Sequence, residues 1–258
     1  MKIVVPLKVA GSPDDSAKLV GGEVDPSSLE WDVNEWDRFA IEAALELSEA
    51  NEGEVVVLSV GGEEIEDGLL TALAMGADRA IQVNVEDGGA RLDAISTARV
   101  IAKALADESP DLVLCGVMSS DGVSSGVGTA LSALLDVPRV AVVNHIDYAG
   151  GELTVTRELE GGLLEKVKLS TPALLTIQTG INEPRYANLR GIRAAGSKPR
   201  EEQTIEDLGL DEDTLAAGSA QQVAIATPPE TDGAQILEGD GAAVAKQIAQ
   251  IIKAKVGA

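Results

Sequence analysis

The part of the sequence best suited to hold a ligand is a run of small and hydroxylated residues at positions 116 to 128. Its members are Gly116, Val117, Met118, Ser119, Ser120, Asp121, Gly122, Val123, Ser124, Ser125, Gly126, Val127 and Gly128. The run follows an apolar stretch, Leu112–Val117, that predicts a strand, and precedes an expected helix at Thr129–Leu135. Small residues let backbone N–H groups approach a ligand, and a helix N-terminus adds positive potential, so the arrangement suits a phosphate.

This Gly/Ser loop (residues 116–128) matches no standard phosphate motif. It lacks the Gly-Lys-Ser/Thr ending of a Walker loop and the Gly-x-Gly-x-x-Gly spacing of dinucleotide sites. Loops of glycine and serine are also frequent as plain turns. From these residues alone, phosphate binding and a simple turn are equal alternatives.

A second cluster precedes the first long helix expected in the chain, at Asn34–Ala50. It reads Asp32-Val33-Asn34-Glu35-Trp36-Asp37. Asn34 is expected to cap the helix with its side chain, while Glu35 and Asp37 place negative charge in the first turn, where it suits the helix dipole. Trp36 either packs as a hydrophobic staple or faces a planar ligand.

A third cluster follows an expected strand at Ala173–Gln178. It reads Asn182-Glu183-Pro184-Arg185-Tyr186-Ala187-Asn188-Leu189-Arg190-Gly191-Ile192. Pro184 restricts the backbone, and Tyr186 is able to pack inward. Leu189 lies between polar neighbours, so it is either a buried loop residue or an exposed anchor for a partner protein.

The chain offers no convincing catalytic apparatus. His145 is the only histidine and has no motif around it, and the serines of the Gly/Ser loop lack nucleophile-elbow spacing. Glu158 and Glu160 alternate along an expected strand, which places both carboxylates on one face, usually a solvated one. The single cysteine, Cys115, lies in an apolar run and is expected to be a buried thiol. A non-catalytic protein is therefore predicted.

Strand and helix patterns alternate through the first half of the chain, apart from an excursion rich in Gly, Ser, Pro and Asp at Ala10–Leu29. Expected strands are Ile3–Leu7, Glu54–Val60, Ala80–Val85 and Leu112–Val117, and expected helices are Asn34–Ala50, Glu63–Met75 and Asp93–Asp107. This alternation implies right-handed βαβ crossovers and a parallel sheet. Ligands bind such sheets beyond the carboxyl ends of the strands, where the strand order reverses.

The second half of the chain has a different pattern. Glu152–Thr156 and Leu164–Leu169 predict two antiparallel strands joined around Gly161–Gly162. The predicted fold class is thus α/β: a mostly parallel, doubly wound sheet with a small antiparallel addition and an extended C-terminal arm. We expect an α/β domain over residues 1–195 and an arm over residues 196–258, which is polar and acidic before a last amphipathic helix at Gly241–Val256.

Composition narrows the function classes. The 258 residues include 43 Asp and Glu against 20 Lys and Arg, a net charge of −23. A surface with this much negative charge repels phosphate backbones and anionic lipid headgroups. Nucleic acid is therefore not an expected partner. No segment reaches the roughly 18 apolar residues of a membrane span, and the start of the chain shows no secretion-signal pattern, so a cytoplasmic protein without membrane insertion is expected.

Taken together and in this order, the three clusters resemble the β subunit of the electron transfer flavoproteins. The likeness extends over most of the chain, through Lys2–Lys8, Ala72–Arg79, Arg157–Gly162 and the Asn182–Ile192 cluster. The Asn-Glu-Trp-Asp form at 34–37 and the stretch Lys198–Glu202 look most like the bacterial branch that serves trimethylamine dehydrogenase.

The resemblance implies a non-catalytic electron carrier that pairs with an α subunit, which supplies most of an FAD site. It implies a structural AMP in the β subunit, contacted by Pro6, by Asn34 to Asp37, by Val60 and by Gly116 to Val127. Trp36 would face the flavin domain, Glu158 would hold that domain, and Leu189, with Tyr186 beside it, would dock the electron donor. The donor would be a dehydrogenase, and a quinone oxidoreductase would be the acceptor leading to the respiratory chain.

Two other interpretations remain. One branch of the family binds a second FAD in place of AMP and bifurcates electrons, with a loop that reads Asp-Gly-Asp-Thr-Ala-Gln-Val-Gly. Here Asp121-Gly122 and Val127-Gly128 match, but Val123 replaces the second Asp and Gly126 the Gln, which favours AMP. The other interpretation is a stand-alone nucleotide-binding stress-response protein of similar fold, which would need neither the acidic arm nor the Asn182–Ile192 cluster.

Overall fold

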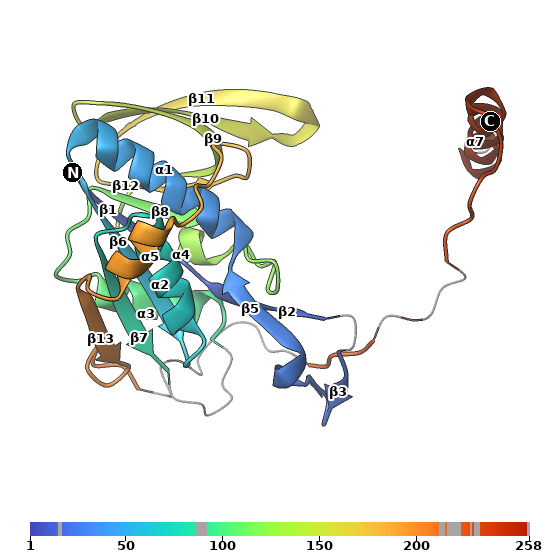
Figure 1. The fold of residues 1–258 in the computed structure, drawn as a ribbon. Coiled ribbons are helices and arrows are strands. Elements are labelled where there is room, and N and C mark those ends of the chain that lie inside the picture. Colours follow the sequence, from blue (N-terminus) through green and yellow to red (C-terminus); the bar gives the residue numbers. More distant parts are fainter. Residues whose placement is uncertain are drawn as a thin grey trace. The chain divides into compact units, whose positions relative to one another are not determined.

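The computed structural model describes residues 1–14, 17–85, 92–211, 215, 223–227, 229 and 233–256. It consists of two compact units, Met1–Ala224 and Ile225–Ala258, which are described separately below. The first unit is built around one large sheet, and the described part of the second is dominated by one helix (Figure 1).

The large sheet has nine strands. In spatial order they are β11 (Leu163–Ser170), β10 (Glu152–Leu159), β9 (Arg139–Ala149), β12 (Ala173–Ile177), β8 (Leu112–Gly116), β1 (Lys2–Pro6), β6 (Glu54–Gly61), β7 (Arg79–Asn84) and β13 (Arg200–Thr204). The strands from β9 to β13 in this order are parallel, whereas β10 and β11 add to one edge as antiparallel strands. The predicted α/β fold class, with an antiparallel addition in the same layer, is confirmed.

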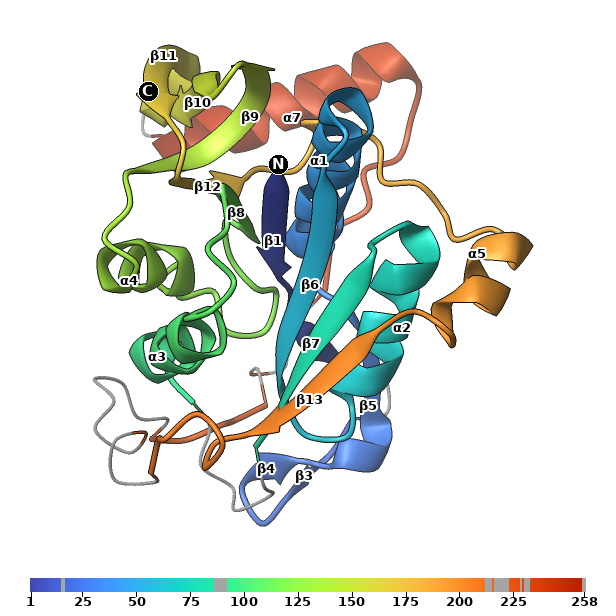
Figure 2. The same ribbon diagram turned by 90° about the vertical axis from the view of Figure 1, so that its left-hand side faces the viewer.

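Helices cover both faces of this sheet because its strands are apolar on both sides (Figure 2). Alternate residues of a strand point to opposite faces. Ile3 and Val5 therefore pack with α1 (Glu35–Asn51) and α2 (Ile65–Met75), while Val4 packs with α3 (Ala94–Ala104) and α4 (Val127–Leu134). A short helix, α5 (Leu189–Ala195), lies on α2. The core is aliphatic, as the composition requires.

The excursion expected at Ala10–Leu29 contains more regular structure than its composition predicts. An antiparallel ribbon pairs β2 (Val9–Pro13) with β5 (Leu29–Val33), and a smaller one pairs β3 (Leu19–Val20) with β4 (Glu23–Val24). A turn of 3-10 helix, η1 (Pro26–Ser28), leads into β5. Gly21 and Gly22 both have positive φ between β3 and β4, which is the backbone that a two-residue hairpin turn requires.

Two strands of the sheet were not predicted. β9 reads Arg-Val-Ala-Val-Val-Asn-His-Ile-Asp-Tyr-Ala, without a regular alternation of polar and apolar residues, and β13 reads Arg-Glu-Glu-Gln-Thr with no apolar residue. The structure also differs from the expected boundary after residue 195, because β13 pairs with β7 and both Ile205 and Leu215 are buried against the same core as α3. The first unit therefore continues to Ala224.

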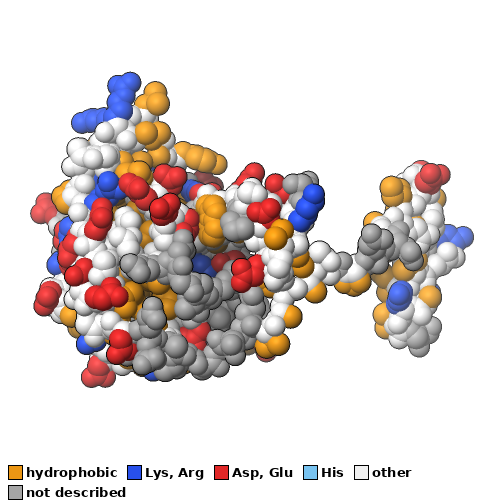
Figure 3. All heavy atoms as spheres, turned by 90° about the horizontal axis from the view of Figure 1, so that it is seen from below, with side chains coloured by type: hydrophobic (Ala, Val, Ile, Leu, Met, Phe, Trp, Pro, Cys, Tyr) orange, Lys and Arg blue, Asp and Glu red, His pale blue; other side chains and the backbone are white. Residues whose placement is uncertain are grey.

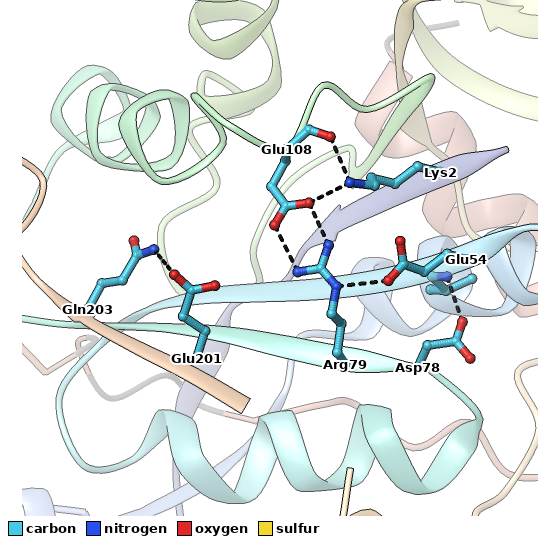
Figure 4. A network of polar contacts seen from close by, with 8 residues as sticks. Lys2, Glu54, Asp78, Arg79, Glu108, Glu201 and Gln203 are labelled. Carbon is cyan, nitrogen blue, oxygen red and sulfur yellow. Dashed lines mark hydrogen bonds and ion pairs between the residues drawn. The ribbon is translucent and has the colours of Figure 1, made fainter. Parts of the chain in front are cut away.

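The N-terminal ends of the parallel strands are joined by an ionic network (Figure 4). The Arg79 guanidinium binds both carboxylate oxygens of Glu108, at 2.8 and 2.5 Å, and its Nε lies 2.8 Å from Glu54. The Lys2 ammonium, 2.9 Å from Glu108, completes the set. Hydrogen bonds from Arg79 and then Lys2, together with their charges, lower the pKa of Glu108 to about 2 despite partial burial. This network ties β1, β6 and β7 together where these strands begin, at the end of the sheet opposite the Gly/Ser loop.

The surface of the first unit carries the acidic excess. Asp and Glu side chains are spread across the face shown in Figure 3. In the part of the chain that the structure describes, no helix is long and apolar enough to cross a membrane.

The second unit contains the helix expected at its end, α7 (Gly241–Val256). Asp240 receives the backbone N–H of Ala243 at 2.8 Å, and Lys253 and Lys255 lie in the last turn, where positive charge suits the helix dipole. Ile248, Ile251 and Ile252 remain exposed along the helix. An apolar side of this kind has no partner among the described residues of its own unit.

Candidate functional site

The Gly/Ser loop lies where the strand order of the sheet reverses. From β1 the chain adds β6 and then β7 on one side, and it returns to pair β8 with the other side of β1. The region beyond the carboxyl ends of β1 and β8 is thus the switch point, where ligands bind in sheets of this type. The loop leaves the end of β8 at Gly116 and enters α4 at Val127, two residues before the expected helix start at Thr129.

Asn34 holds this loop instead of capping its own helix. Its side chain makes no capping hydrogen bond to α1, so that expectation is wrong. The amide nitrogen of Asn34 donates to the carbonyl of Met118 at 2.8 Å, and its oxygen accepts the backbone N–H of Ser120 at 3.1 Å. Because Asn34 is only 3% exposed, these two bonds hold the first half of the loop from the protein interior.

Asp37 fastens the two strand ends on either side of the switch point. Its carboxylate accepts the backbone N–H of Lys8, after β1, at 2.8 Å, and that of Gly116, at the end of β8, at 2.9 Å. Burial raises the pKa of Asp37 to about 6, although these hydrogen bonds act in the opposite direction. The folded state therefore binds a proton here more readily than the unfolded chain does, and this group alone favours folding more at pH 4 than at pH 7.

Gly116 is required at this position by the close approach of β8 to α1. The Cβ of an alanine would lie 2.4 Å from Oδ1 of Asp37 and 2.7 Å from Cβ of Trp36. The Trp36 Cβ is attached directly to the helix backbone, and the Asp37 carboxylate is held by its hydrogen bonds to Lys8 and Gly116, so neither can move away cheaply.

We therefore expect Gly116→Ala to lower the free energy of unfolding by about 1–3 kcal/mol, the usual cost of overpacking a buried contact. Thermal melts of the purified protein give the measurement, since ~1 kcal/mol shifts the melting temperature by about 2–4 °C at this chain length. The matched control is Gly196→Ala, where a Cβ meets nothing within 4 Å and φ is −64°. Equal melting temperatures for the two variants would contradict the close approach.

The second half of the loop has the backbone of an anion-binding nest. Val123 and Ser125 have positive φ, of 50° and 49°, although neither is glycine, and Gly126 then returns to the right-handed helical region. Alternation of this kind turns successive N–H groups toward one point. The N–H groups of Ser124, Ser125 and Gly126 have no acceptor among the described residues. The strain at Val123 is of the sort found where a loop serves a ligand.

Lys8 is a member of the site that sequence reasoning missed. Its ammonium lies 2.7 Å from the carboxylate of Asp121, with the side chain about half exposed. Partial burial opposes ionisation of Asp121, but the hydrogen bonds from Lys8 and Ser119 outweigh it and lower its pKa. The signal for Lys8 was its place directly after the first strand, beside the switch point.

The remaining expected nucleotide contacts lie around the same switch point. Pro6 ends β1 and is buried, and Val60, near the end of β6, is half-buried. Glu35 is exposed at the start of α1, and Trp36 is half-buried beside it. The structure thus brings the expected contacts of 34–37 and 116–127 together at the ends of β1 and β8, with Val60 one strand away.

A second polar group lies beside the first, at the ends of β12 and β10. The indole N–H of Trp36 donates to Gln178 at 3.2 Å, and the amide of Gln178 donates to Glu158 at 3.4 Å. Asn144 donates to the other oxygen of Glu158 at 3.1 Å. Gln178 and Asn144 were not singled out in the sequence. Glu160 begins the turn η2 (Glu160–Gly162) and does not continue β10, so the expected sharing of one strand face with Glu158 is wrong.

Ion pairs from Arg185 attach the third cluster to α1. The Arg185 guanidinium lies 2.8 to 3.0 Å from the Glu42 carboxylate and 2.5 Å from Glu49, while the Arg185 backbone N–H donates to Glu42 as well. Glu42 has a side chain only 5% exposed. Sequence reasoning missed this clamp (Arg185, Glu42 and Glu49).

Beyond the clamp, the cluster presents apolar side chains to solvent. Leu189 is 75% exposed and Tyr186 95%, so Tyr186 does not pack inward. Asn188 caps α5 by accepting the N–H of Gly191 at 2.9 Å, which fixes Leu189 at the first helical position. Gly191 packs so closely on α2 that a Cβ there would lie 2.2 Å from the carbonyl oxygen of Ala74. Leu189 is therefore exposed on a rigid support.

The other candidate groups behave as structural residues. Cys115 is buried, as expected, and burial raises its thiol pKa. His145 is exposed and lies 3.3 Å from Asp147. No cluster of potential metal ligands occurs among the residues that the structure describes.

The fold and the site together define an α/β protein with a glycine- and serine-rich loop at the switch point of a mostly parallel sheet. A family model for the electron transfer flavoprotein domain matches residues 22–208. The chain is 40% identical over 265 residues to the electron transfer flavoprotein subunit beta of Methylophilus methylotrophus, with 100% of each chain covered. The corresponding subunit of Bacillus subtilis is 34% identical, covering 99% of this chain and 98% of that one. That of Mycobacterium bovis is 30% identical, covering 98% of each.

The chain therefore belongs to the electron transfer flavoprotein β-subunit family. The resemblance seen in the sequence is confirmed, and with it a role in flavoprotein electron transport.

Proposed function

We propose that this protein is the non-catalytic β subunit of a heterodimeric electron transfer flavoprotein in the cytoplasm, holding AMP at the switch point between β1 and β8. The observation that carries the proposal is the Gly/Ser loop, which combines three N–H groups that have no acceptor among the described residues with a helix N-terminus at the switch point. Hydrogen bonds from the buried side chains of Asn34 and Asp37 hold this loop in place. A nucleotide phosphate fits such donors, and no redox chemistry is required of the residues that bind it.

AMP is favoured over a second FAD by the residues of the loop. Val123 occupies the place of the acidic residue in the bifurcating branch, and its side chain is 60% exposed. The charges of Lys8 and Asp121 neutralise each other in an ion pair, so the loop otherwise offers only neutral hydrogen-bond donors.

FAD, held mainly by the α subunit, would supply the electron chemistry. The residues of this chain would bind and position that subunit. Trp36 and Glu158 lie on one continuous hydrogen-bonded face suited to receive the flavin domain. The arm was expected at residues 196–258, and its part beyond Ala224 would wrap the α subunit, because the apolar side of α7 has no partner among the described residues of its own unit. Leu189 and Tyr186 would dock a donor dehydrogenase, such as trimethylamine dehydrogenase, with a quinone oxidoreductase as acceptor.

The nucleotide content of the native complex tests the proposal. Co-expression with the α chain should yield a one-to-one complex that releases one FAD and one AMP per heterodimer on denaturation. Chromatography of the extract against standards gives the count. Two FAD per heterodimer would move the protein to the bifurcating branch. A stable homodimer that holds nucleotide without an α chain would favour the stand-alone stress-response alternative.

A further inference from the structure

Gln178 occupies the junction between two residues of the proposed flavin-facing surface. It follows β12 directly, and its backbone N–H donates to the carbonyl of Val143 at 2.9 Å, so its Cα is fixed by the sheet. The side chain is half-buried. It lies between the indole of Trp36, from α1, and the carboxylate of Glu158, from β10.

The orientation of the Gln178 amide is determined by its neighbours. Its oxygen accepts two N–H donors, the indole of Trp36 at 3.2 Å and the backbone of Thr179 at 3.0 Å. An N–H donor cannot face an NH₂ group, so a flipped amide would lose both bonds. The NH₂ group must therefore point to the remaining acceptor, which is Glu158, 3.4 Å away.

Glu158 is held by neutral donors alone among the described residues. Gln178 reaches one oxygen of its carboxylate and Asn144 the other. Asn144 is available because the pairing of β9 with β10 skips it, so this residue is the extra one of a β-bulge. Bulges often redirect a side chain next to a functional site. No lysine or arginine of the described chain pairs with Glu158, so the carboxylate is oriented while its charge remains uncompensated.

We propose that Gln178 is a positioning residue that fixes the Trp36 indole and the Glu158 carboxylate relative to each other, so that an incoming flavin domain meets both in one geometry. This inference rests on the proposed function of that face. Asn144 shares the task for Glu158 but makes no hydrogen bond to Trp36 within the described part of the chain. The two amides therefore have separable effects.

The test uses the complete heterodimer, reconstituted from a β chain labelled with fluorotryptophan and an unlabelled α chain. The β chain has two tryptophans, Trp31 and Trp36, and a Trp31→Phe variant assigns their fluorine resonances. Gln178→Leu should move or broaden the Trp36 resonance and leave that of Trp31 unchanged. Asn144→Ala should leave both resonances in place.

The functional readout is the accessibility of the flavin, measured by iodide quenching of its fluorescence. Gln178→Leu and Asn144→Ala should each raise the population with an accessible flavin by about two- to tenfold, because each removes one solvent-exposed hydrogen bond to the Glu158 carboxylate. Melting temperatures should stay close to that of the unaltered heterodimer. Glu158→Gln serves as the reference, because it removes the charge on which the proposed function depends.

The outcomes distinguish failure of the positioning role of Gln178 from failure of the proposed function of the face. An unmoved Trp36 resonance in Gln178→Leu overturns the inference. So does a flavin that responds to Glu158→Gln but not to Gln178→Leu, and in that case the proposed function of the face survives. If Glu158→Gln leaves the flavin unchanged, the proposed function of the face fails and the positioning role fails with it.

Discussion

Replacing Arg185 by methionine is expected to lower the free energy of unfolding by about 2–4 kcal/mol, because it leaves the buried Glu42 carboxylate without its cation. Glu42 is buried beneath the Asn182–Ile192 cluster, and the guanidinium and backbone N–H of Arg185 supply its partners. The value lies below that for a fully enclosed pair, since the Arg185 side chain is 35% exposed and water screens part of the interaction. Denaturant or thermal unfolding of the purified protein measures it.

Two comparisons make this expectation sharp. Arg200→Met breaks a similar pair with Glu66 at 2.8 Å, but Glu66 is 54% exposed, so a loss of only about 0–1 kcal/mol is expected. The double variant Glu42→Gln with Arg185→Met should recover part of the lost stability, because no buried charge then remains unpaired. If Arg185→Met and Arg200→Met unfold alike, the clamp does not hold the cluster.

Truncation of Leu189 is expected to have its main effect on binding. Leu189→Ala should weaken docking of the donor dehydrogenase by about tenfold or more, because burying a leucine is worth roughly 1.5–3 kcal/mol and ~1.4 kcal/mol is tenfold in affinity. The melting temperature and the FAD and AMP contents should barely change, since the side chain is 75% exposed in the free subunit. Titration of reduced dehydrogenase against both forms, beside thermal melts, gives the comparison.

A matched control is Val20→Ala, which removes an apolar side chain that is 64% exposed on the ribbon of β3 and β4. It should affect neither docking nor stability. A core leucine would behave in the opposite way to Leu189, with a cavity costing ~2–5 kcal/mol of stability. Docking that is the same for Leu189→Ala and Val20→Ala would show that the donor binds elsewhere.

Apolar periodicity was enough to predict the main elements. β1, β6, β7 and β8 are short apolar runs buried on both faces, and α1 to α4 carry apolar residues at helical spacing. β13 was missed because an edge strand needs no apolar residue: its place is fixed by backbone pairing with β7. β9 was missed because two register shifts break its alternation, one of them at Val142, whose φ is 61°.

The candidate site was only partly predictable for a different reason. The Gly/Ser loop and the 34–37 cluster are continuous in sequence, so their residue types could be recognised together. Their functions depend on partners far along the chain: Asn34 reaches Met118, Trp36 reaches Gln178, and Glu42 reaches Arg185. A polar residue of this kind gives no local signal. Asn34 is the clearest case, since its position before a helix favours capping and its side chain instead bonds to the loop.

The open sheet also bears on how the protein avoids aggregation. β11 and β13 are its outer strands, and such edges present unpaired backbone groups to any passing strand. Both edges carry charged side chains: Glu165, Lys166 and Lys168 on β11, and Arg200, Glu201 and Glu202 on β13. Adding another strand to either edge would bring these charges against a neighbour and remove them from water. The polar sequence that hid β13 from recognition thus also disfavours the addition of a further strand at that edge of the sheet.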